Sequence, residues 1–268
     1  MPDYLSHSLF ADALLSADFP LRDVCARHAA LFRFGSQGPD LFYYCAVIRP
    51  RGGYAALADG IHDAGSDLPV LALLREARRD GASDAALAYL LGFLAHLHLD
   101  GAAHPFICEK AKSIAAQRGV SEGCAHVQFE STIEARELFE TRGIAPQRFR
   151  VRADLPQDAG ERRLTASLCC GLCSAWGLPA PREDRLAADI ALLPALFAVL
   201  FDKCGAARAV LDAKYALTGR DFAARWHIKR PFRPETAADV LSDDAYARYR
   251  ALEQAGKESW LAAARTLV

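Results

Sequence analysis

The sequence lacks a charge excess of either sign. Its 268 residues carry 32 Lys and Arg against 33 Asp and Glu, which gives a formal net charge of −1. Proteins that bind nucleic acids usually carry a basic excess, so we expect no nucleic-acid partner. The chain also lacks long alternations of Val, Ile and Thr, whereas Ala and Leu are abundant. This composition favours helices over sheets.

No apolar run is long enough to cross a bilayer, which needs roughly 20 residues. The longest run, IALLPALFAVLF at 190–201, has 12 residues and contains Pro194. The first residues, MPDYLSHSLFADALL, lack the basic region of a signal peptide. The eight cysteines show no spacing typical of a disulfide scaffold. We therefore expect a cytoplasmic protein with reduced cysteines and no transmembrane segment, for which peripheral membrane contact stays open.

The apolar periodicity predicts an all-α fold, a multi-helix bundle. We expect a single domain over 1–268, with a metal-bearing half at 1–145 and a helical supporting half of unrecognised type at 146–268. A long helix is capped by Ser83 and Asp84 and should end near Ala103, because a residue before proline avoids the helical conformation. The other expected helices cover 8–17, 20–35, 68–80, 122–141, 162–177, 184–203, 206–217 and 244–266.

Two pairs of potential metal ligands stand at helical spacing. His96 and Asp100 are four residues apart, and His104 follows four residues later at the expected helix end. His126 and Glu130 repeat the spacing on the next helix. Residues four apart share one face of a helix, so two facing helices would present these side chains to one cavity, as metal-binding bundles do.

The donor types favour zinc. Imidazole nitrogen with carboxylate oxygen suits zinc better than calcium or magnesium, which prefer oxygen ligands alone. No thiolate is expected beside these ligands, which argues against a Cys-rich structural site. The alternative is that they are solvated or core histidines. His98 points about 160° away from His96 and Asp100 on the helix, so we expect a supporting or core role for it.

Five stretches match a known family in its own order: PDYLSHSLF, FGSQGPDLFYY, ADGIHDAG, YLLGFLAHLHLDGAAHPFI and HVQFE. With them, the sequence resembles the zinc-dependent phospholipase C family, which is related in fold to the S1/P1 nucleases. The match covers about residues 2–130. The Gly-x-x-Gly-Pro-Asp and His-x-x-x-Asp…His-Pro combinations are its specific features.

The resemblance implies a His/Asp/Glu metal cluster at one end of the helix bundle. Eight ligands would hold two or three Zn²⁺ ions there: His7, Asp40, His62, His96, Asp100, His104, His126 and Glu130. One ion would take Asp40, His62, His96 and Asp100. A second would take His104, His126 and Glu130. A third would take His7, with Asp100 bridging it to the first. Secreted members complete the third site with a mature N-terminal residue, whereas this chain begins Met-Pro. We therefore expect that site to be built differently, half-occupied or empty.

The resemblance further implies a metal-dependent hydrolase of phosphoesters that uses metal-activated water. The substrate would be a small phosphoester or a phospholipid head group, and Asp40 would also serve as the base. Two alternatives stay open: a metal-binding helical scaffold without turnover, and an S1/P1-like nuclease. Without the resemblance, Asp40 would also be explained as a turn residue or helix cap, and His62 as an exposed loop histidine. Asp59 or Asp63, which flank His62, would also serve in its place as a ligand or orient its ring.

Three other patterns have a structural interpretation and a functional one. Phe34, Phe42, Tyr43 and Tyr44 either belong to the core or line a head-group pocket. Cys170 and Cys173 are expected to be buried helix cysteines rather than a redox pair. The basic stretch RWHIKRPFRP at 225–234 is expected to be a solvated loop, although it would also suit anionic head groups.

Overall fold

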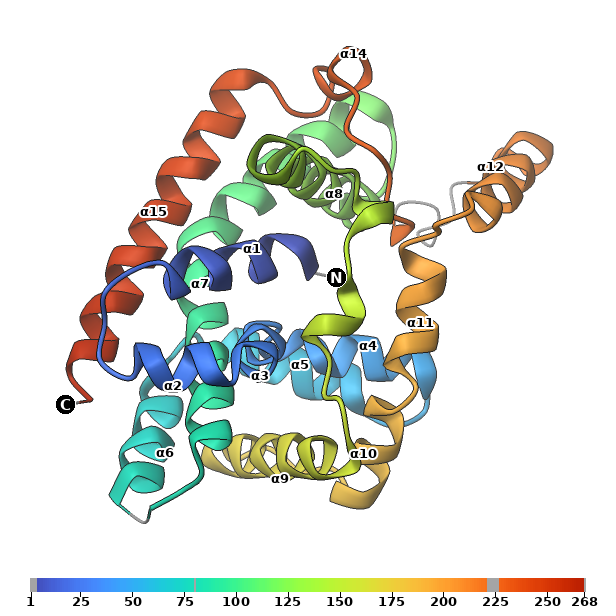
Figure 1. Ribbon diagram of the computed structural model, residues 1–268. Helices are drawn as coiled ribbons and strands as arrows, with labels where there is room; N and C mark the ends of the chain where they lie inside the picture. Colours follow the sequence, from blue (N-terminus) through green and yellow to red (C-terminus); the bar gives the residue numbers. More distant parts are fainter. Residues whose placement is uncertain (1–3, 80, 221–226, 268) are drawn as a thin grey trace. The chain divides into compact units, whose positions relative to one another are not determined.

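A computed structural model describes residues 4–79, 81–220 and 227–267 of the chain (Figure 1). Over these residues the structure consists of helices, 3₁₀ turns and loops, without a strand. The expected all-α, multi-helix fold is therefore confirmed.

The chain divides into two compact units, each assembled from three separate segments. Unit 1 contains the described residues of Met1–Ser6, Ala103–Arg150 and Ala195–Glu253. Unit 2 contains those of His7–Ala102, Val151–Pro194 and Gln254–Val268. Both units take residues from either side of residue 145, so the boundary expected there does not coincide with this division.

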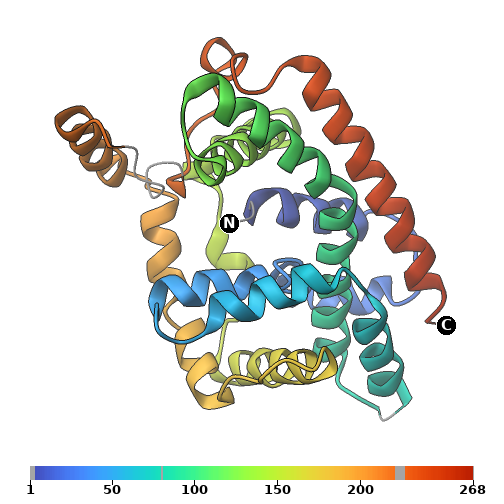
Figure 2. The same ribbon diagram turned by 180° about the vertical axis from the view of Figure 1, so that it is seen from behind.

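Unit 2 holds most of the short helices. Its elements are α1 (Tyr4–Leu15, from His7 onward), α2 (Arg22–Arg27), α3 (Ala29–Gly35), α4 (Asp40–Ile48), α5 (Tyr54–Ala64), α6 (Leu68–Arg79), the first part of α7 (Asp84–Arg118), η2 (Val151–Asp154), α9 (Ala159–Ala175), α10 (Glu183–Ile190) and the last part of α15 (Asp243–Arg265). Helices α4 and α5 lie side by side, and α9 packs on α10 (Figures 1 and 2). Trp260 of α15 is fully buried and donates its indole N–H to the Leu91 carbonyl of α7 at 3.1 Å. That contact fixes the end of the chain against the helix that carries His96.

Unit 1 is organised around α8 (Glu122–Arg142). Its other elements are α7 from Ala103 onward, η1 (Pro146–Arg148), α11 (Leu193–Leu200, from Ala195 onward), α12 (Ala206–Thr218), α14 (Pro234–Ala237) and α15 up to Glu253. Tyr4 enters an aromatic core here, with ring centroids 6.4, 4.8 and 6.1 Å from those of Phe149, Phe197 and Phe201. The first described residues are therefore part of the core of this unit.

Two buried carboxylates on α8 hold the same N-terminal segment. Glu134 accepts the Leu5 amide at 3.1 Å and pairs with Lys229 at 2.5 Å. Glu137 accepts the Ser6 hydroxyl at 2.9 Å. Lys229 is 7% exposed, so the expectation of a solvated basic loop is wrong for this residue. Its ammonium compensates a carboxylate that would be costly to bury alone. Arg225 and Trp226 of the same stretch lie outside the described residues.

The long helix does not end near Ala103 as expected, because α7 continues through Pro105 to Arg118. A proline inside a helix removes one hydrogen bond and costs about 3 kcal/mol. On its C-terminal side, however, α7 buries Phe106, Ile107 and Ile114, and each such side chain contributes roughly 1.5–3 kcal/mol. Burial in the fold outweighs the local preference of the residue before proline.

Other helix boundaries also differ from those expected from the sequence. The expected helix at 20–35 is interrupted at His28 and forms α2 and α3. The one at 184–203 is interrupted after Ile190, and Pro194 lies in the first turn of α11. Residues 40–48 and 54–64, for which no helix was expected, form α4 and α5. The helices expected at 68–80, 122–141, 162–177, 206–217 and 244–266 are confirmed within three residues at each end.

Helix α7 is also the one described helix that is long and apolar enough to cross a membrane by length and composition. Of its most apolar window, 67% is buried inside the protein. The core helix of a soluble protein has the same properties, so this is weak evidence for a membrane span.

Glycines allow α3 and the loop after it to approach α7. A Cβ on Gly35 would lie 2.2 Å from the Tyr89 carbonyl oxygen, and one on Gly92 would lie 2.1 Å from the Phe32 carbonyl oxygen. Gly38 has a φ of +51°, and a Cβ there would lie 2.3 Å from Cγ of His96. The turn that leads into α4 is thus pressed against the His96 ring.

We expect Gly38→Ala to destabilise the protein. A side chain in the left-handed region costs about 1–2 kcal/mol, and the contact with His96 adds to that cost. At roughly 2–4 °C for each kcal/mol, the melting temperature should fall by about 5 °C or more. The matched control is Gly171→Ala in α9, where a Cβ meets open space and alanine favours the helix. A Gly38→Ala protein that melts with the wild type would contradict this account of the turn.

Candidate metal centre

The carboxylate of Asp40 is enclosed by imidazole rings in unit 2. Asp40 begins α4 and has no exposed surface. Its Oδ1 lies 3.2 Å from Nε2 of His62, and its Oδ2 lies 3.7 Å from Nδ1 of His96 and 3.9 Å from Nε2 of His7. Among the described residues, neither oxygen has a hydrogen-bond partner. A buried carboxylate without hydrogen bonds is costly unless a cation compensates its charge.

Backbone carbonyls orient two of these rings. Nδ1 of His62 lies 2.8 Å from the Ala58 carbonyl oxygen, and Nδ1 of His96 lies 3.2 Å from that of Ser36. A neutral imidazole that donates through Nδ1 keeps a lone pair on Nε2. The two Nε2 atoms lie 3.4 Å apart. Ligand atoms at zinc–nitrogen distances in a tetrahedral site lie about 3.4 Å from each other, so the spacing fits a shared ion.

A second triplet overlaps the first. The ligand atoms of His7, His96 and Asp100 all lie within 4.8 Å of one another, as do those of Asp40, His62 and His96. The rings of His7 and His96 are stacked, with centroids 4.2 Å apart and an interplanar angle of 20°. Ser36 fixes the backbone of α1 here by donating its hydroxyl to the His7 carbonyl at 3.0 Å. The structure thus brings together the five residues expected in unit 2, and His96 is the one that both triplets contain.

The environment shifts the protonation of this group. Burial raises the pKa of Asp40 to about 7, although the nearby His62 opposes the shift. Burial by itself would lower the pKa of His62, but contact with the Asp40 carboxylate outweighs it and raises the pKa to about 9. Without an ion, the pair therefore retains protons that its members would release in water.

A cavity of about 460 Å³ opens beside the group, and its wall includes His62 and Asp100. His98 lines the same cavity, but its ring nitrogens face Ser259 (2.9 Å) and Asp67 (3.3 Å), so neither triplet includes it. The half-buried Asp100 is thus the carboxylate of the two triplets that reaches the cavity wall. Asp40 is fully buried and is not among the residues that line the cavity.

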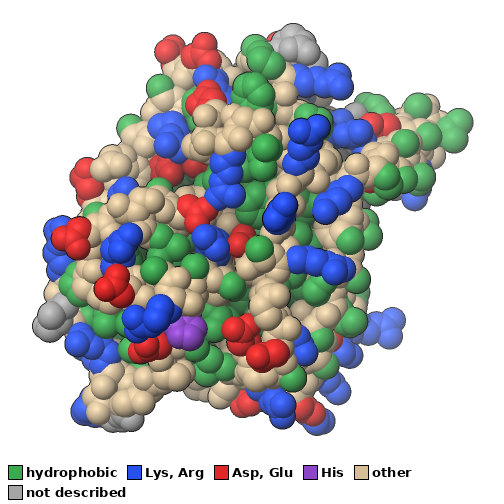
Figure 3. Space-filling view, in the orientation of Figure 1, with side chains coloured by type: hydrophobic (Ala, Val, Ile, Leu, Met, Phe, Trp, Pro, Cys, Tyr) green, Lys and Arg blue, Asp and Glu red, His purple; other side chains and the backbone are tan. Residues whose placement is uncertain are grey.

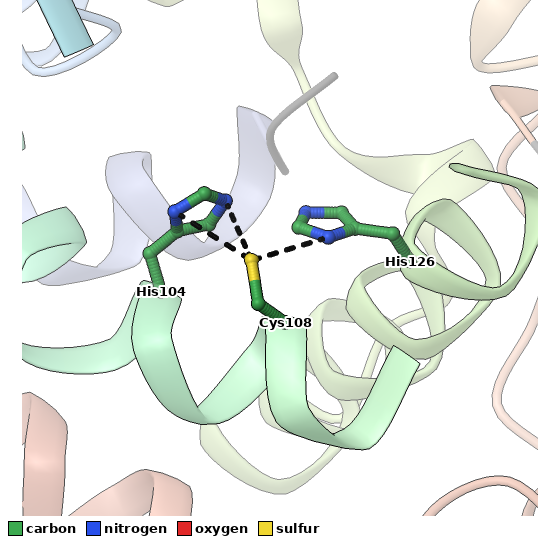
Figure 4. A group of neighbouring side chains, drawn as sticks. All are labelled: His104, Cys108 and His126. Carbon is green, nitrogen blue, oxygen red and sulfur yellow. Dashed lines mark hydrogen bonds between the residues drawn. The ribbon is translucent and has the colours of Figure 1, made fainter. Parts of the chain in front are cut away.

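A separate group forms in unit 1 from His104, Cys108 and His126 (Figure 4). Sγ of Cys108 lies 3.7 Å from Nε2 of His104 and 4.0 Å from Nδ1 of His126. The expectation that no thiol lies beside the ligands is therefore wrong. Cys108 follows His104 by four residues, the same spacing that marks His96 and Asp100. The sequence did not reveal the pairing of His104 with Cys108, because the helix was expected to end near Ala103.

Glu130, expected as a ligand with His104 and His126, is not part of the group that these two histidines form with Cys108. Its Oε1 lies 2.9 Å from Nε2 of His126, the ring nitrogen that is not directed at Cys108. Burial would raise the pKa of Glu130, but the contact with His126 outweighs it and holds the pKa below its usual value. Among the described residues, its buried Oε2 has no hydrogen-bond partner.

The remaining expectations concern residues near these groups. Phe34, Phe42 and Tyr44 are buried, which is the core interpretation. Tyr43 is half-buried, stacks on His62 with centroids 5.8 Å apart, and donates its hydroxyl to Asp59 at 2.5 Å. Asp59 therefore holds Tyr43 in place, and both Asp59 and Asp63 are exposed. The helix position expected for the two cysteines is confirmed, since α9 contains both. Cys173 is fully buried as expected, whereas Cys170 is half-buried and donates to the Pro181 carbonyl at 3.2 Å.

Comparison with family models, with curated proteins and with solved structures found no match to this chain. The site must therefore be interpreted from its own geometry and from the motifs in the sequence.

We expect metal-free protein to lose stability as the pH rises between about 4 and 9. Folded Asp40 holds its proton up to about pH 7 instead of 3.8, and folded His62 up to about pH 9 instead of 6.5. The folded state then binds more protons than the unfolded state, so the free energy of unfolding falls with rising pH. Zinc requires deprotonated ligands, so the rise in melting temperature on adding zinc should be larger at pH 8 than at pH 6.

Thermal denaturation after removal of metal with EDTA, with and without added zinc, measures both effects. The control is Asp40→Asn, which has no carboxylate to titrate and should lose most of the zinc-induced increase. An equal increase at both pH values, or none in protein shown to be metal-free, would be the contrary result.

Proposed function

We propose that this protein is a zinc-dependent hydrolase of phosphoesters, similar in activity to the zinc-dependent phospholipases C. The observation that carries the proposal is the convergence of Nε2 of His62, Nε2 of His96 and Oδ1 of Asp40 beside a cavity. Two neutral ring nitrogens and a carboxylate suit zinc better than an all-oxygen cation. The motif resemblance gives the reaction class.

The cavity determines what a substrate would meet. A volume of about 460 Å³ is in the range of sites for small molecules, roughly 300–1,000 Å³, and suits a head group or small phosphoester. The net charge is −1, and acidic and basic side chains are interspersed on the face shown in Figure 3. This distribution favours a small anionic substrate over a long polyanion such as a nucleic acid.

Zinc-class ions bound here would supply a water of lowered pKa and would neutralise phosphate charge. The protein would supply the ligand atoms and a group that accepts a proton. His62 and His96 present lone pairs fixed by the Ala58 and Ser36 carbonyls, and the buried carboxylate of Asp40 lies against both rings. Asp100, at the cavity wall, would accept a proton from water at a carboxylate oxygen. For Asp40 the geometry supports the ligand role, and its additional role as a base stays a prediction.

We expect Asp100→Asn to reduce kcat/KM for phosphoester hydrolysis by about 10²-fold or more, the size of the loss when one preorganised electrostatic group is removed. The substitution keeps the shape of the side chain and removes its charge. Asp63→Asn is the matched control: it makes the same chemical change at an exposed position on α5 and should leave the rate unchanged.

The measurement uses zinc-loaded protein and a panel of chromogenic phosphomonoesters and phosphodiesters, together with phospholipid vesicles. If the wild type binds zinc and hydrolyses none of these, the enzyme proposal is wrong and a metal-binding scaffold takes its place. If it cleaves single-stranded nucleic acid faster than the small esters, the substrate class is wrong.

A further inference from the structure

We propose that His104, Cys108 and His126 form a zinc-class metal site in unit 1, with Cys108 as a thiolate ligand. The site would differ from the His104, His126 and Glu130 set that the family resemblance implies. The inference rests on the proposed function only in that both require a zinc-class ion, and it is independent of catalysis.

The distances in the group are close to those of a coordinated ion. Zinc–sulfur bonds of about 2.3 Å and zinc–nitrogen bonds of about 2.0–2.1 Å place the ligand atoms of a tetrahedral site roughly 3.6 Å apart. Sγ of Cys108 lies 3.7 Å from Nε2 of His104 and 4.0 Å from Nδ1 of His126. The two rings lie at 66° to each other with centroids 5.1 Å apart, and in the view of Figure 4 they lie on either side of the Cys108 sulfur. All three side chains are half-buried, so an ion can enter from solvent.

The orientation of His126 separates the thiol from Glu130. Nδ1 of His126 is directed at Cys108, while Nε2 lies 2.9 Å from Oε1 of Glu130. A metal-binding histidine commonly gives its second nitrogen to a carboxylate, which fixes the ring and makes the ligand nitrogen more basic. In this geometry Glu130 is the positioning residue for His126, and Cys108 occupies the ligand position.

The charges of the group balance once an ion binds. Binding breaks the S–H bond of Cys108, releases its proton to solvent and forms the metal–sulfur bond, with no change in oxidation state. One thiolate and two neutral imidazoles leave a net charge of +1 around a divalent ion, and the adjacent Glu130 carboxylate offsets it. A sulfur donor also favours zinc and cobalt over magnesium, calcium and manganese.

Cobalt(II) provides the direct test, because thiolate coordination gives a sulfur-to-cobalt charge-transfer band in the near ultraviolet that nitrogen and oxygen ligands do not give. Metal-free full-length protein is titrated with CoCl₂, and the band is followed in the wild type and in Cys108→Ser. We expect the band in the wild type and its complete loss in the variant. The triplets of unit 2 contain no cysteine and contribute nothing to it.

Two further variants complete the test. Cys204→Ser changes an exposed cysteine of the same unit and should keep the full band. Glu130→Gln should also keep the band, with cobalt affinity lowered about 10–100-fold, as expected when the partner of a ligand is removed. Loss of the band in Glu130→Gln at saturating cobalt, together with its persistence in Cys108→Ser, would assign the ligand position to Glu130 and overturn the proposal.

Alkylation of the wild type gives a readout that does not depend on the folding of a variant. Zinc should protect Cys108 from iodoacetamide, measured by peptide mass spectrometry, and should leave Cys204 equally reactive. Equal labelling of Cys108 with and without saturating zinc would overturn the proposal. Hydrolysis without the charge-transfer band would refute this inference alone, whereas the band without hydrolysis would refute the proposed function alone.

Discussion

The buried charge of Asp40 is the constraint on which the arrangement of unit 2 depends. An ionised carboxylate without exposed surface costs several kcal/mol unless opposite charge compensates it. His7, His62 and His96 lie within 3.9 Å of its oxygens, and each comes from a different helix. The packing of α1, α4, α5 and α7 therefore has to satisfy one electrostatic requirement, which a divalent cation would meet.

Groups of the loop that precedes α4 fix the residues around Asp40 in place. The loop from Ser36 to Asp40 supplies a carbonyl for His96, a hydroxyl for the His7 backbone and the carboxylate itself. Gly38 allows the loop to lie against the His96 ring, since any Cβ there would overlap it. The Gly-x-x-Gly-Pro-Asp motif thus has a physical explanation: its glycines allow close approach to α7, and the aspartate follows at the position that this approach determines.

Local spacing was sufficient to predict the helical class and to place His96 and Asp100 in one group, because both depend on periodicity along the chain. Asp40 and His62 were different, since no spacing links them to His96, and only the motif resemblance pointed to them. Cys108 was missed because Pro105 indicated a helix end, and local propensity does not include the burial of Phe106 and Ile107 that keeps α7 helical. The pairing of Glu130 with the far nitrogen of His126 depends on ring orientation, which spacing does not determine.

The different donor atoms suggest different roles for the two groups. In unit 2 the candidate ligand atoms are nitrogen and oxygen, and Asp100 and His62 reach a cavity of a size that would admit a small molecule. A carboxylate can release or bind a proton while an ion stays in place, so such a group suits chemistry on a bound molecule. In unit 1 a thiol replaces the carboxylate among the three converging side chains. Thiolate ligands bind zinc tightly, and the binding free energy adds to the folding free energy. An ion held by this group would join α7 to α8, the helix whose Glu134 and Glu137 also hold the first described residues of the chain. An ion there would stabilise unit 1 whether or not it takes part in turnover.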